Sequence, residues 1–178
     1  MNFTETKIKG VFIVDPERFG DDRGFVAPSF SAREFAERGM ANQIAETNIS
    51  YSLKRGTLRG LHFQKAPHGQ AKLVRCTRGR VFDVAVDLRP DSPTHRQWVG
   101  VELTAENRRM LYLPGDCAHG FQTLEDDTEV FYMVSGPYAP YSSGGYRWDD
   151  PAFRIEWPDA GGERIIIKRD REYPDYEL

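Results

Sequence analysis

The sequence predicts an all-β protein, an antiparallel sandwich or barrel, and three observations support this prediction. From residue 48 onward, apolar and polar residues alternate in many short segments. Turn-forming pairs such as Arg78-Gly79 separate these segments. Almost no segment shows helical periodicity. Because a strand points successive side chains to opposite faces, this pattern indicates short strands that each cover one side of a core.

The expected strands follow one another closely along the chain. The first covers residues 10–14 and ends at Asp15-Pro16, because proline lacks the backbone N–H that a strand needs. The others cover residues 48–52, 57–64, 70–77, 80–88, 97–103, 109–113, 118–124 and 128–135, and a short last strand covers residues 165–170. Strands of this spacing fit one barrel and leave no linker, so residues 1–178 are predicted to form a single domain.

One helix is clearly signalled. Ser31 and Glu34 form a capping-box pattern, in which the serine caps the first turn. The helix is expected to run to about Arg38 and to stop before Gly39, a typical C-terminal residue.

The remaining segments are expected to be loops. Residues 19–24 and 138–145 are rich in turn-forming residues. Trp148 and Trp157 carry large apolar rings and are predicted to pack over the barrel wall. The polar tail, residues 173–178, is predicted to be loose.

Composition limits the possible classes of function. The net charge of −3 over 178 residues gives no whole-molecule electrostatic argument for nucleic-acid binding. No apolar run approaches the roughly 20 residues that a membrane helix needs. The polar N-terminal residues do not form a signal peptide. Cys76 and Cys117 lie in separate predicted strands without metal-ligand spacing, so a reduced, cytoplasmic protein is expected.

Residues 57–64, read as T-L-R-G-L-H-F-Q, combine strand-forming residues with Arg59 and His62. Burying either side chain without a partner would cost several kcal/mol. One interpretation is an edge strand with a solvated arginine and a hydrogen-bonded histidine. The other is a strand that lines a polar pocket, where His62 is a base and Arg59 holds an anion. Strict alternation places these two side chains on opposite faces, so a pocket needs a bulge at Gly60 or an arginine that reaches in from the rim.

Strand alternation places further polar side chains on apolar faces. Lys72 shares a face with Val74, Asp83 with Val81, His119 with Phe121, and Tyr132 with Val130. One such residue would usually be a hydrogen-bonded core group. Four of them on different strands, together with the histidine of 57–64, favour a lined cavity.

A catalytic metal is not predicted. Residues 113–119, L-P-G-D-C-A-H, resemble the second histidine motif of cupin barrels. The first cupin motif would supply two histidines one residue apart and a glutamate, but residues 61–64 offer only His62. Three converging nitrogen or oxygen ligands are therefore hard to find.

Several long motifs carry a resemblance that extends over about residues 10–174. They are G-T-L-R-G-L-H-F-Q at 56–64, K-L-V-R-C-T-R-G at 72–79, F-D-V-A-V-D-L-R at 82–89, V-E-L-T-A-E-N at 101–107, A-H-G-F-Q at 118–122 and R-W-D-D-P at 147–151. In this order they are similar to the dTDP-4-dehydrorhamnose 3,5-epimerase family. The resemblance implies a cupin-type antiparallel jelly-roll barrel with one or two short helices, no metal or other cofactor, and a homodimer. It implies a nucleotide-sugar substrate, a nucleoside-diphosphate 4-keto-6-deoxy sugar.

The resemblance also implies roles for individual residues. His62 matches the catalytic base and Asp170 the acidic residue that orients its ring. Lys72 matches the cation beside the enolate oxygen, and Tyr132 the acid on the opposite face of the sugar. Asp83 is not part of this set; as a strand neighbour, it is expected to hold Lys72 in place.

The remaining implied positions bind substrate. Arg23 and Arg59 match diphosphate-binding residues, and His119 matches a histidine of the substrate pocket. The other substrate-binding positions are Phe19, Phe25, Asn48, Gln64 and Tyr138.

The sequence departs from the family pattern at three places. Pro28 replaces an acidic residue of the base-binding run, residues 140–145 lack two glutamates, and Ala71 replaces the glycine before the lysine. These changes leave open the nucleobase and whether both C3 and C5 are epimerised. A 3-epimerase, a sugar-nucleotide ketoisomerase and a non-catalytic sugar-binding jelly roll are the alternatives.

Overall fold

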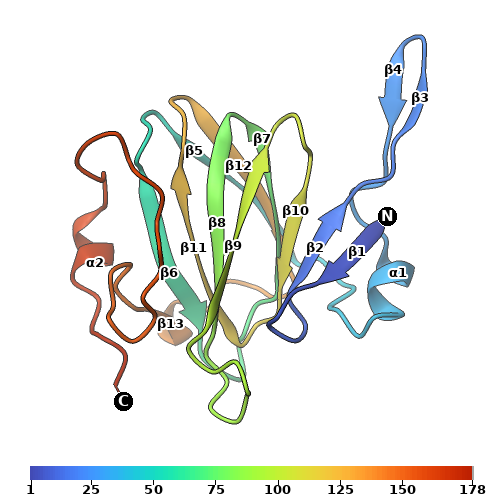
Figure 1. Cartoon of the computed structure of the whole chain (residues 1–178). Coiled ribbons are helices and arrows are strands. Elements are labelled where there is room, and N and C mark those ends of the chain that lie inside the picture. The colour runs from blue at the N-terminus through green and yellow to red at the C-terminus, as the bar shows by residue number, and fades with distance from the viewer. Residues whose placement is uncertain (178) are drawn as a thin grey trace.

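Two antiparallel sheets face each other in this computed structural model, which describes residues 1–177 (Figure 1). One sheet has the strand order β1 (Asn2–Glu5), β2 (Phe12–Asp15), β10 (Met110–Leu113), β7 (Lys72–Arg78), β12 (Thr128–Val134) and β5 (Glu46–Ser52). The other has the order β13 (Ser143–Gly145), β6 (Leu58–Gln64), β11 (Cys117–Thr123), β8 (Arg80–Asp87) and β9 (Trp98–Thr104). The predicted all-β, antiparallel jelly-roll barrel is confirmed.

The alternating pattern located the barrel strands well. Each strand expected between residues 10 and 135 forms within two residues of its predicted ends. Strands β1 and β13 were not predicted, because they are short and do not alternate. Residues 19–24, expected as a loop, instead belong to a hairpin of β3 (Phe19–Asp21) and β4 (Gly24–Val26), which stands away from the barrel (Figure 1).

The predicted last strand, residues 165–170, is wrong. Ile165 makes only an isolated parallel bridge with Thr57, and the chain then forms helix α2 (Lys168–Arg171). The edge of β6 beyond this bridge is already paired with β13 and with Tyr146. The segment has no free strand edge to extend along, so three consecutive isoleucines do not make a strand there.

The predicted helix is present as α1 (Ala32–Ala36) and ends slightly earlier than expected. The backbone N–H of Glu34 donates to Ser31 Oγ at 3.3 Å, as the capping pattern predicted. Phe35 is buried against Phe3 and Tyr112, so the helix covers part of the outer face of the six-stranded sheet.

The C-terminal segment covers the outer face of the other sheet. Trp157 packs with Phe153 and Phe82 there, as expected for a ring over the barrel wall. The expectation of a loose tail is wrong for the described residues: the Tyr176 N–H donates to Asp150 Oδ2 at 2.6 Å, and its ring packs in the same cluster. Leu178 lies outside the described residues.

Between the sheets, an apolar core fills part of the barrel and polar side chains line the rest. The core includes Val74, Leu111, Ala85 and Leu103 from both sheets. Cys76 and Cys117 are free and buried, and burial raises the pKa of each thiol to about 12. Within residues 1–177, no helix is long and apolar enough to cross a membrane.

Candidate active site

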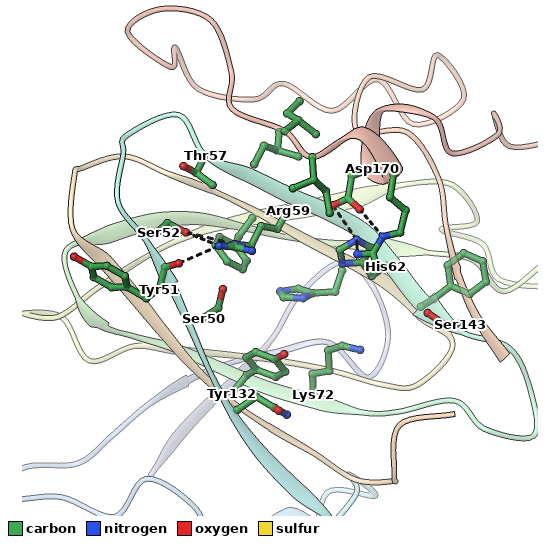
Figure 2. Close-up of a pocket in the computed structure, with 18 of the residues that line it drawn as sticks. Ser50, Tyr51, Ser52, Thr57, Arg59, His62, Lys72, Tyr132, Ser143 and Asp170 are labelled. Carbon is green, nitrogen blue, oxygen red and sulfur yellow. Dashed lines mark hydrogen bonds and ion pairs between the residues drawn. The ribbon is translucent and has the colours of Figure 1, made fainter. Parts of the chain in front are cut away.

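A cavity of about 930 Å³ lies between the two sheets and is lined by residues of both (Figure 2). This volume suits a ligand of drug or nucleotide-sugar size. The predicted residues that line it are His62, Lys72, Tyr132, Asp170, Arg59, His119, Asn48, Gln64 and Tyr138. The interpretation of residues 57–64 as a pocket-lining strand is therefore confirmed, and the edge-strand alternative is wrong.

A bulge at Gly60 explains how Arg59 and His62 reach the same cavity. Gly60 has φ +127°, a conformation that side chains rarely adopt. The pairing register with β11 shifts at this point, between His119 and Phe121. The extra residue turns the strand so that both side chains face the pocket. Of the two explanations that the sequence left open, the bulge is the correct one.

His62 and Asp170 form a hydrogen-bonded pair at the cavity wall. His62 Nε2 lies 3.0 Å from Asp170 Oδ2 (Figure 2). The same oxygen accepts the Gly60 N–H at 3.1 Å, and Arg169 Nε donates to Oδ1 at 3.1 Å. Burial acts to raise the pKa of Asp170, but the hydrogen bonds from His62, Gly60 and Arg169 outweigh it, and the pKa lies below its usual value. The carboxylate thus stays charged and holds the imidazole by Nε2, which leaves the other ring nitrogen, Nδ1, outside the pair.

Lys72 and Tyr132 lie on the facing sheet, across the cavity from His62 (Figure 2). In the register of β12 with β7, Tyr132 pairs with Val74 and Val134 pairs with Lys72, so both side chains point inward from neighbouring strands. Burial lowers the pKa of Lys72 to about 8. Burial also raises the pKa of Tyr132, and this effect outweighs the positive charge of Arg59, which acts to lower it. The tyrosine therefore keeps its proton as a phenol near neutral pH.

Asp83 does not hold Lys72, so that expectation is wrong. Asp83 Oδ1 instead lies 2.8 Å from His119 Nε2, and Asp83 is fully buried. Antiparallel pairing of β8 with β11 places Asp83 opposite Phe121, next to His119. The wall of the five-stranded sheet thus carries two histidines, and each is paired with an aspartate of its own.

Two of the predicted substrate-binding residues are held by backbone groups and, for Arg59, also by the Ser52 hydroxyl. Arg59 Nη2 donates to the Tyr51 carbonyl at 3.0 Å and lies 3.4 Å from Ser52 Oγ, which fixes its guanidinium at the cavity wall. Gln64 donates to the His68 carbonyl at 2.7 Å and accepts the Ala139 N–H at 2.7 Å. The Gln64 amide therefore fixes the loop at the rim.

Phe19, Arg23 and Phe25 are not among the residues that line this cavity. They lie on the β3–β4 hairpin, where Arg23 Nη2 pairs with Asp21 and Phe19 is 61% exposed. The hairpin projects beyond the barrel (Figure 1). Within one chain, these three predicted nucleotide-binding residues therefore lie outside the cavity that holds the predicted catalytic residues.

Sequence reasoning missed two residues of helix α2 and its continuation. Arg169 lines the cavity, and its Nη2 lies 3.4 Å from His62 Nε2. The ring of Tyr173 meets the His62 ring edge-on, with centroids 5.9 Å apart. The one available signal was the position of Arg169 directly before Asp170.

Among residues 1–177, no three His, Cys, Asp or Glu side chains are grouped closely enough to hold a metal ion. His62 and His119 are each paired with an aspartate of their own. Metal-independent turnover remains a prediction.

Comparison with known proteins identifies relatives over nearly the whole chain. A family model described as dTDP-4-dehydrorhamnose 3,5-epimerase matches residues 5–177. The dTDP-4-dehydrorhamnose 3,5-epimerase of Shigella flexneri is 47% identical over 176 residues, 93% of this chain and 97% of that protein. A dTDP-4-dehydrorhamnose 3-epimerase of Streptomyces niveus is 40% identical over 166 residues, 93% of this chain and 79% of that protein.

The fold agrees with these relatives. The crystal structure of dTDP-4-dehydrorhamnose 3,5-epimerase from Elizabethkingia anophelis NUHP1 has a TM-score of 0.95 at 37% identity, and the match covers 99% of this chain and 96% of that chain. The cupin-type jelly roll implied by the sequence motifs is thereby confirmed. From the family model, the relatives and the fold together, the chain belongs to the dTDP-4-dehydrorhamnose 3,5-epimerase family.

Proposed function

We propose that this cavity epimerises a nucleoside-diphosphate 4-keto-6-deoxy sugar at C3 and C5 without a cofactor. Family membership makes the protein an isomerase. One observation carries the assignment of roles: His62, paired with Asp170 of helix α2, lies on one sheet, and Lys72 and Tyr132 lie on the facing sheet. Facing sheets are about 10 Å apart, which leaves room for a sugar ring between base and acid.

Each role follows from the chemistry of a ketone. The C4 carbonyl acidifies the neighbouring C–H bonds, so His62 removes a proton from C3 or C5, and the bonding electrons move to the C4 oxygen. The ammonium group of Lys72 stabilises the resulting enolate. Tyr132 then gives its proton to the same carbon from the opposite face, which inverts the configuration. Proton exchange with solvent restores the neutral histidine and the phenol.

The sugar nucleotide is proposed to bind along the charged part of the cavity. The guanidinium groups of Arg59 and Arg169 lie on its wall and suit the diphosphate. His119, Asn48 and Tyr138 also line the cavity and are proposed to contact the substrate. The relatives are named for a thymidine-diphosphate sugar, so a dTDP-sugar is the proposed substrate.

A homodimer is proposed as the working unit. Helix α1 covers only part of the outer face of the six-stranded sheet. The uncovered part exposes apolar side chains, with Ile49 66% exposed, and Phe131 pairs with Ile49 in the register. A second copy of the chain would bury this surface.

The hairpin gives the dimer a role in catalysis. Arg23, Phe19 and Phe25 lie outside the cavity of their own chain, and both phenylalanines are exposed. We infer that the hairpin of each subunit reaches the cavity of its partner, where Arg23 binds the diphosphate and the two rings contact the base. Residues 1–178 are proposed to act as one domain, in the cytoplasm.

Epimerisation at C3 alone is the second candidate. The Streptomyces niveus relative is named a 3-epimerase. In this chain the rim strand β13 begins at Ser143, in the stretch that lacks the two glutamates of the family pattern. A rim without these carboxylates holds the sugar differently, and C5 needs a shift of the ring after the first inversion.

Proton exchange in D2O tests the proposal and separates the alternatives. A dTDP-4-keto-6-deoxy sugar is incubated with the enzyme in D2O and followed by NMR. Deuterium at C3 and C5 with inversion at both carbons is expected, and deuterium at C3 alone would make the protein a 3-epimerase. Movement of the carbonyl would identify a ketoisomerase. Absence of exchange with thymidine, cytidine and guanosine nucleotides would leave a sugar-binding protein and refute the proposal.

A further inference from the structure

Two histidine–aspartate pairs lie side by side on one wall of the cavity. His119 on β11 is directly opposite His62 on β6, so the two imidazoles project from the same face of the sheet. The Cβ atoms of such opposed residues are about 5 Å apart. In both pairs the carboxylate contacts Nε2, which leaves Nδ1 as the second nitrogen of each ring.

The two carboxylates differ in their other partners. Asp170 receives N–H groups from Gly60 and Arg169 as well as from the histidine, and the guanidinium offsets its charge. The carboxylate of Asp170 therefore needs no further proton for balance, and Nδ1 of His62 is left outside the pair as the proposed proton acceptor.

Asp83 has no such compensation. It is fully buried, and within residues 1–177 its Oδ2 has no hydrogen-bond partner. Its strand partners are Phe121 and Val101, both apolar. Burial raises the pKa of Asp83, against the attraction of His119. A charged Asp83 beside a neutral His119 would leave a net negative charge in these apolar surroundings, which is costly. One additional proton on the pair removes that net charge.

If the Asp83–His119 pair is electrically neutral as a whole, the protonation of His119 Nδ1 is fixed. The shared proton can reside on Asp83 Oδ1 or on His119 Nε2. In both arrangements the other ring nitrogen, Nδ1, carries a hydrogen. We propose that Asp83 is a positioning residue that keeps Nδ1 of His119 protonated, so that His119 donates a hydrogen bond to the C4 oxygen of the bound sugar beside the base His62.

This inference rests on the proposed function and completes its charge balance. The C4 oxygen is bonded to the carbon next to the one that is deprotonated, so a donor beside His62 lies close to where negative charge develops. Lys72 approaches from the facing sheet, and His119 approaches from the sheet of the base. The same pairing motif thus supplies a proton acceptor at His62 and a hydrogen-bond donor at His119.

NMR of ¹⁵N-histidine-labelled protein without substrate tests the protonation directly. The chain has four histidines, and the signals of His119 are identified by their loss in His119→Gln. A protonated Nδ1 is expected in the wild type at neutral pH, and loss of that proton, at least in part, in Asp83→Asn. An unprotonated Nδ1 in the wild type would overturn the inference. This measurement needs no turnover, so it stands apart from failure of the proposed function.

Kinetics test whether Asp83 acts through His119. Asp83→Asn is expected to lower kcat about 10- to 100-fold, with a smaller change in KM, because the lost donor acts mainly on the enolate. In a His119→Gln background, Asp83→Asn should cost nothing further. A full additional loss in the double variant would overturn the positioning role.

Asp87→Asn is the matched control. Asp87 is also a fully buried aspartate of β8, but its carboxylate binds Arg89, Ser92 and Thr94. This variant should lower stability and leave the Nδ1 signal of His119 unchanged. An equal change of that signal in Asp87→Asn would show a general structural effect and contradict the proposal.

Discussion

At the residue scale, the proposed reaction depends on side chains whose charge the fold controls. The phenol of Tyr132 stays protonated because burial raises its pKa, while the carboxylate of Asp170 stays charged because donors surround it. The proposed acid, Tyr132, and the proposed orienting carboxylate, Asp170, thus coexist in one cavity at one pH, because burial and hydrogen bonding set their pKa values differently.

The proposed base, His62, and its partner, Asp170, should differ in their importance for turnover. His62→Asn removes the proton acceptor and is expected to lower kcat by about 10³-fold or more, with the fold kept. Asp170→Asn keeps the imidazole and is expected to cost about 10²-fold, because it loses orientation only. Steady-state kinetics with circular-dichroism melting curves measure both. Near-normal turnover by a folded His62→Asn protein would contradict the assignment.

Lys72 should set an alkaline limit of activity. Its pKa is lowered by burial to about 8, and the enolate needs the protonated form. The value of kcat/KM is therefore expected to fall above about pH 8, by about tenfold per pH unit. A pH profile of kcat/KM measures this.

The same pKa shift of Lys72 has a consequence for stability. In the unfolded chain the lysine keeps its ordinary, higher pKa, so the folded state binds fewer protons between about pH 8 and that value, and stability should rise with pH there. Lys72→Met removes the buried charge, so at pH 7 its free energy of unfolding is expected to exceed that of the wild type by about 1–3 kcal/mol. Urea denaturation at pH 7 compares the two. In the activity profile, an unchanged alkaline fall of kcat/KM in Lys72→Arg would show that a group other than Lys72 causes that fall.

At the element scale, the bulge in β6 places Arg59 and His62 in the same cavity. A Cβ at Gly60 would lie 2.5 Å from Gly120 Cα and 2.8 Å from the His119 carbonyl oxygen, both backbone atoms of β11. A side chain at this position would push the two strands apart and move His62.

Gly60→Ala is therefore expected to lower the free energy of unfolding by about 2–5 kcal/mol and to abolish turnover. Gly24→Ala is a matched control for stability, because Gly24 has a similar φ of +129° and nothing within 4 Å of the added Cβ. Denaturant melts of both variants separate backbone strain from steric overlap. Equal losses would show that contact with β11 has no effect.

At the scale of the whole molecule, the exposed hairpin and the cavity predict that each active site needs two chains. Arg23→Ala and His62→Asn should each be weakly active alone. When they are co-expressed or mixed under exchange conditions, the mixed dimer should regain activity. Its Arg23→Ala subunit has an intact base and receives the intact hairpin of its partner.

Kinetics of the mixed sample, with the dimer population measured by native mass spectrometry, test this sharing. Recovery toward half of the wild-type activity per mixed dimer is expected, since one of its two cavities is complete. Mixed dimers without recovery would contradict an active site that is shared between two chains. A monomer in solution would contradict the dimer itself.

The sequence by itself determined the barrel strands, the inward side chains and the family. Alternation is a local property, so it located strands within residues 10–135 and placed Lys72, His119 and Tyr132 on inner faces. Of the predicted catalytic residues that line the cavity, His62 and Lys72 lie in motifs that are contiguous along the chain, and Tyr132 and Asp170 were identified from the resemblance of the whole chain.

Only the tertiary structure decided which groups meet. The partner of Asp83 is His119 because strand register, which no local pattern specifies, sets the neighbours of a buried carboxylate. The segment 165–170 became a bridge and helix α2 because the edge of β6 was already paired. Arg169 entered the site only through that helix. Local preference sets what a segment can form, and the free edges and charges around it decide what it forms.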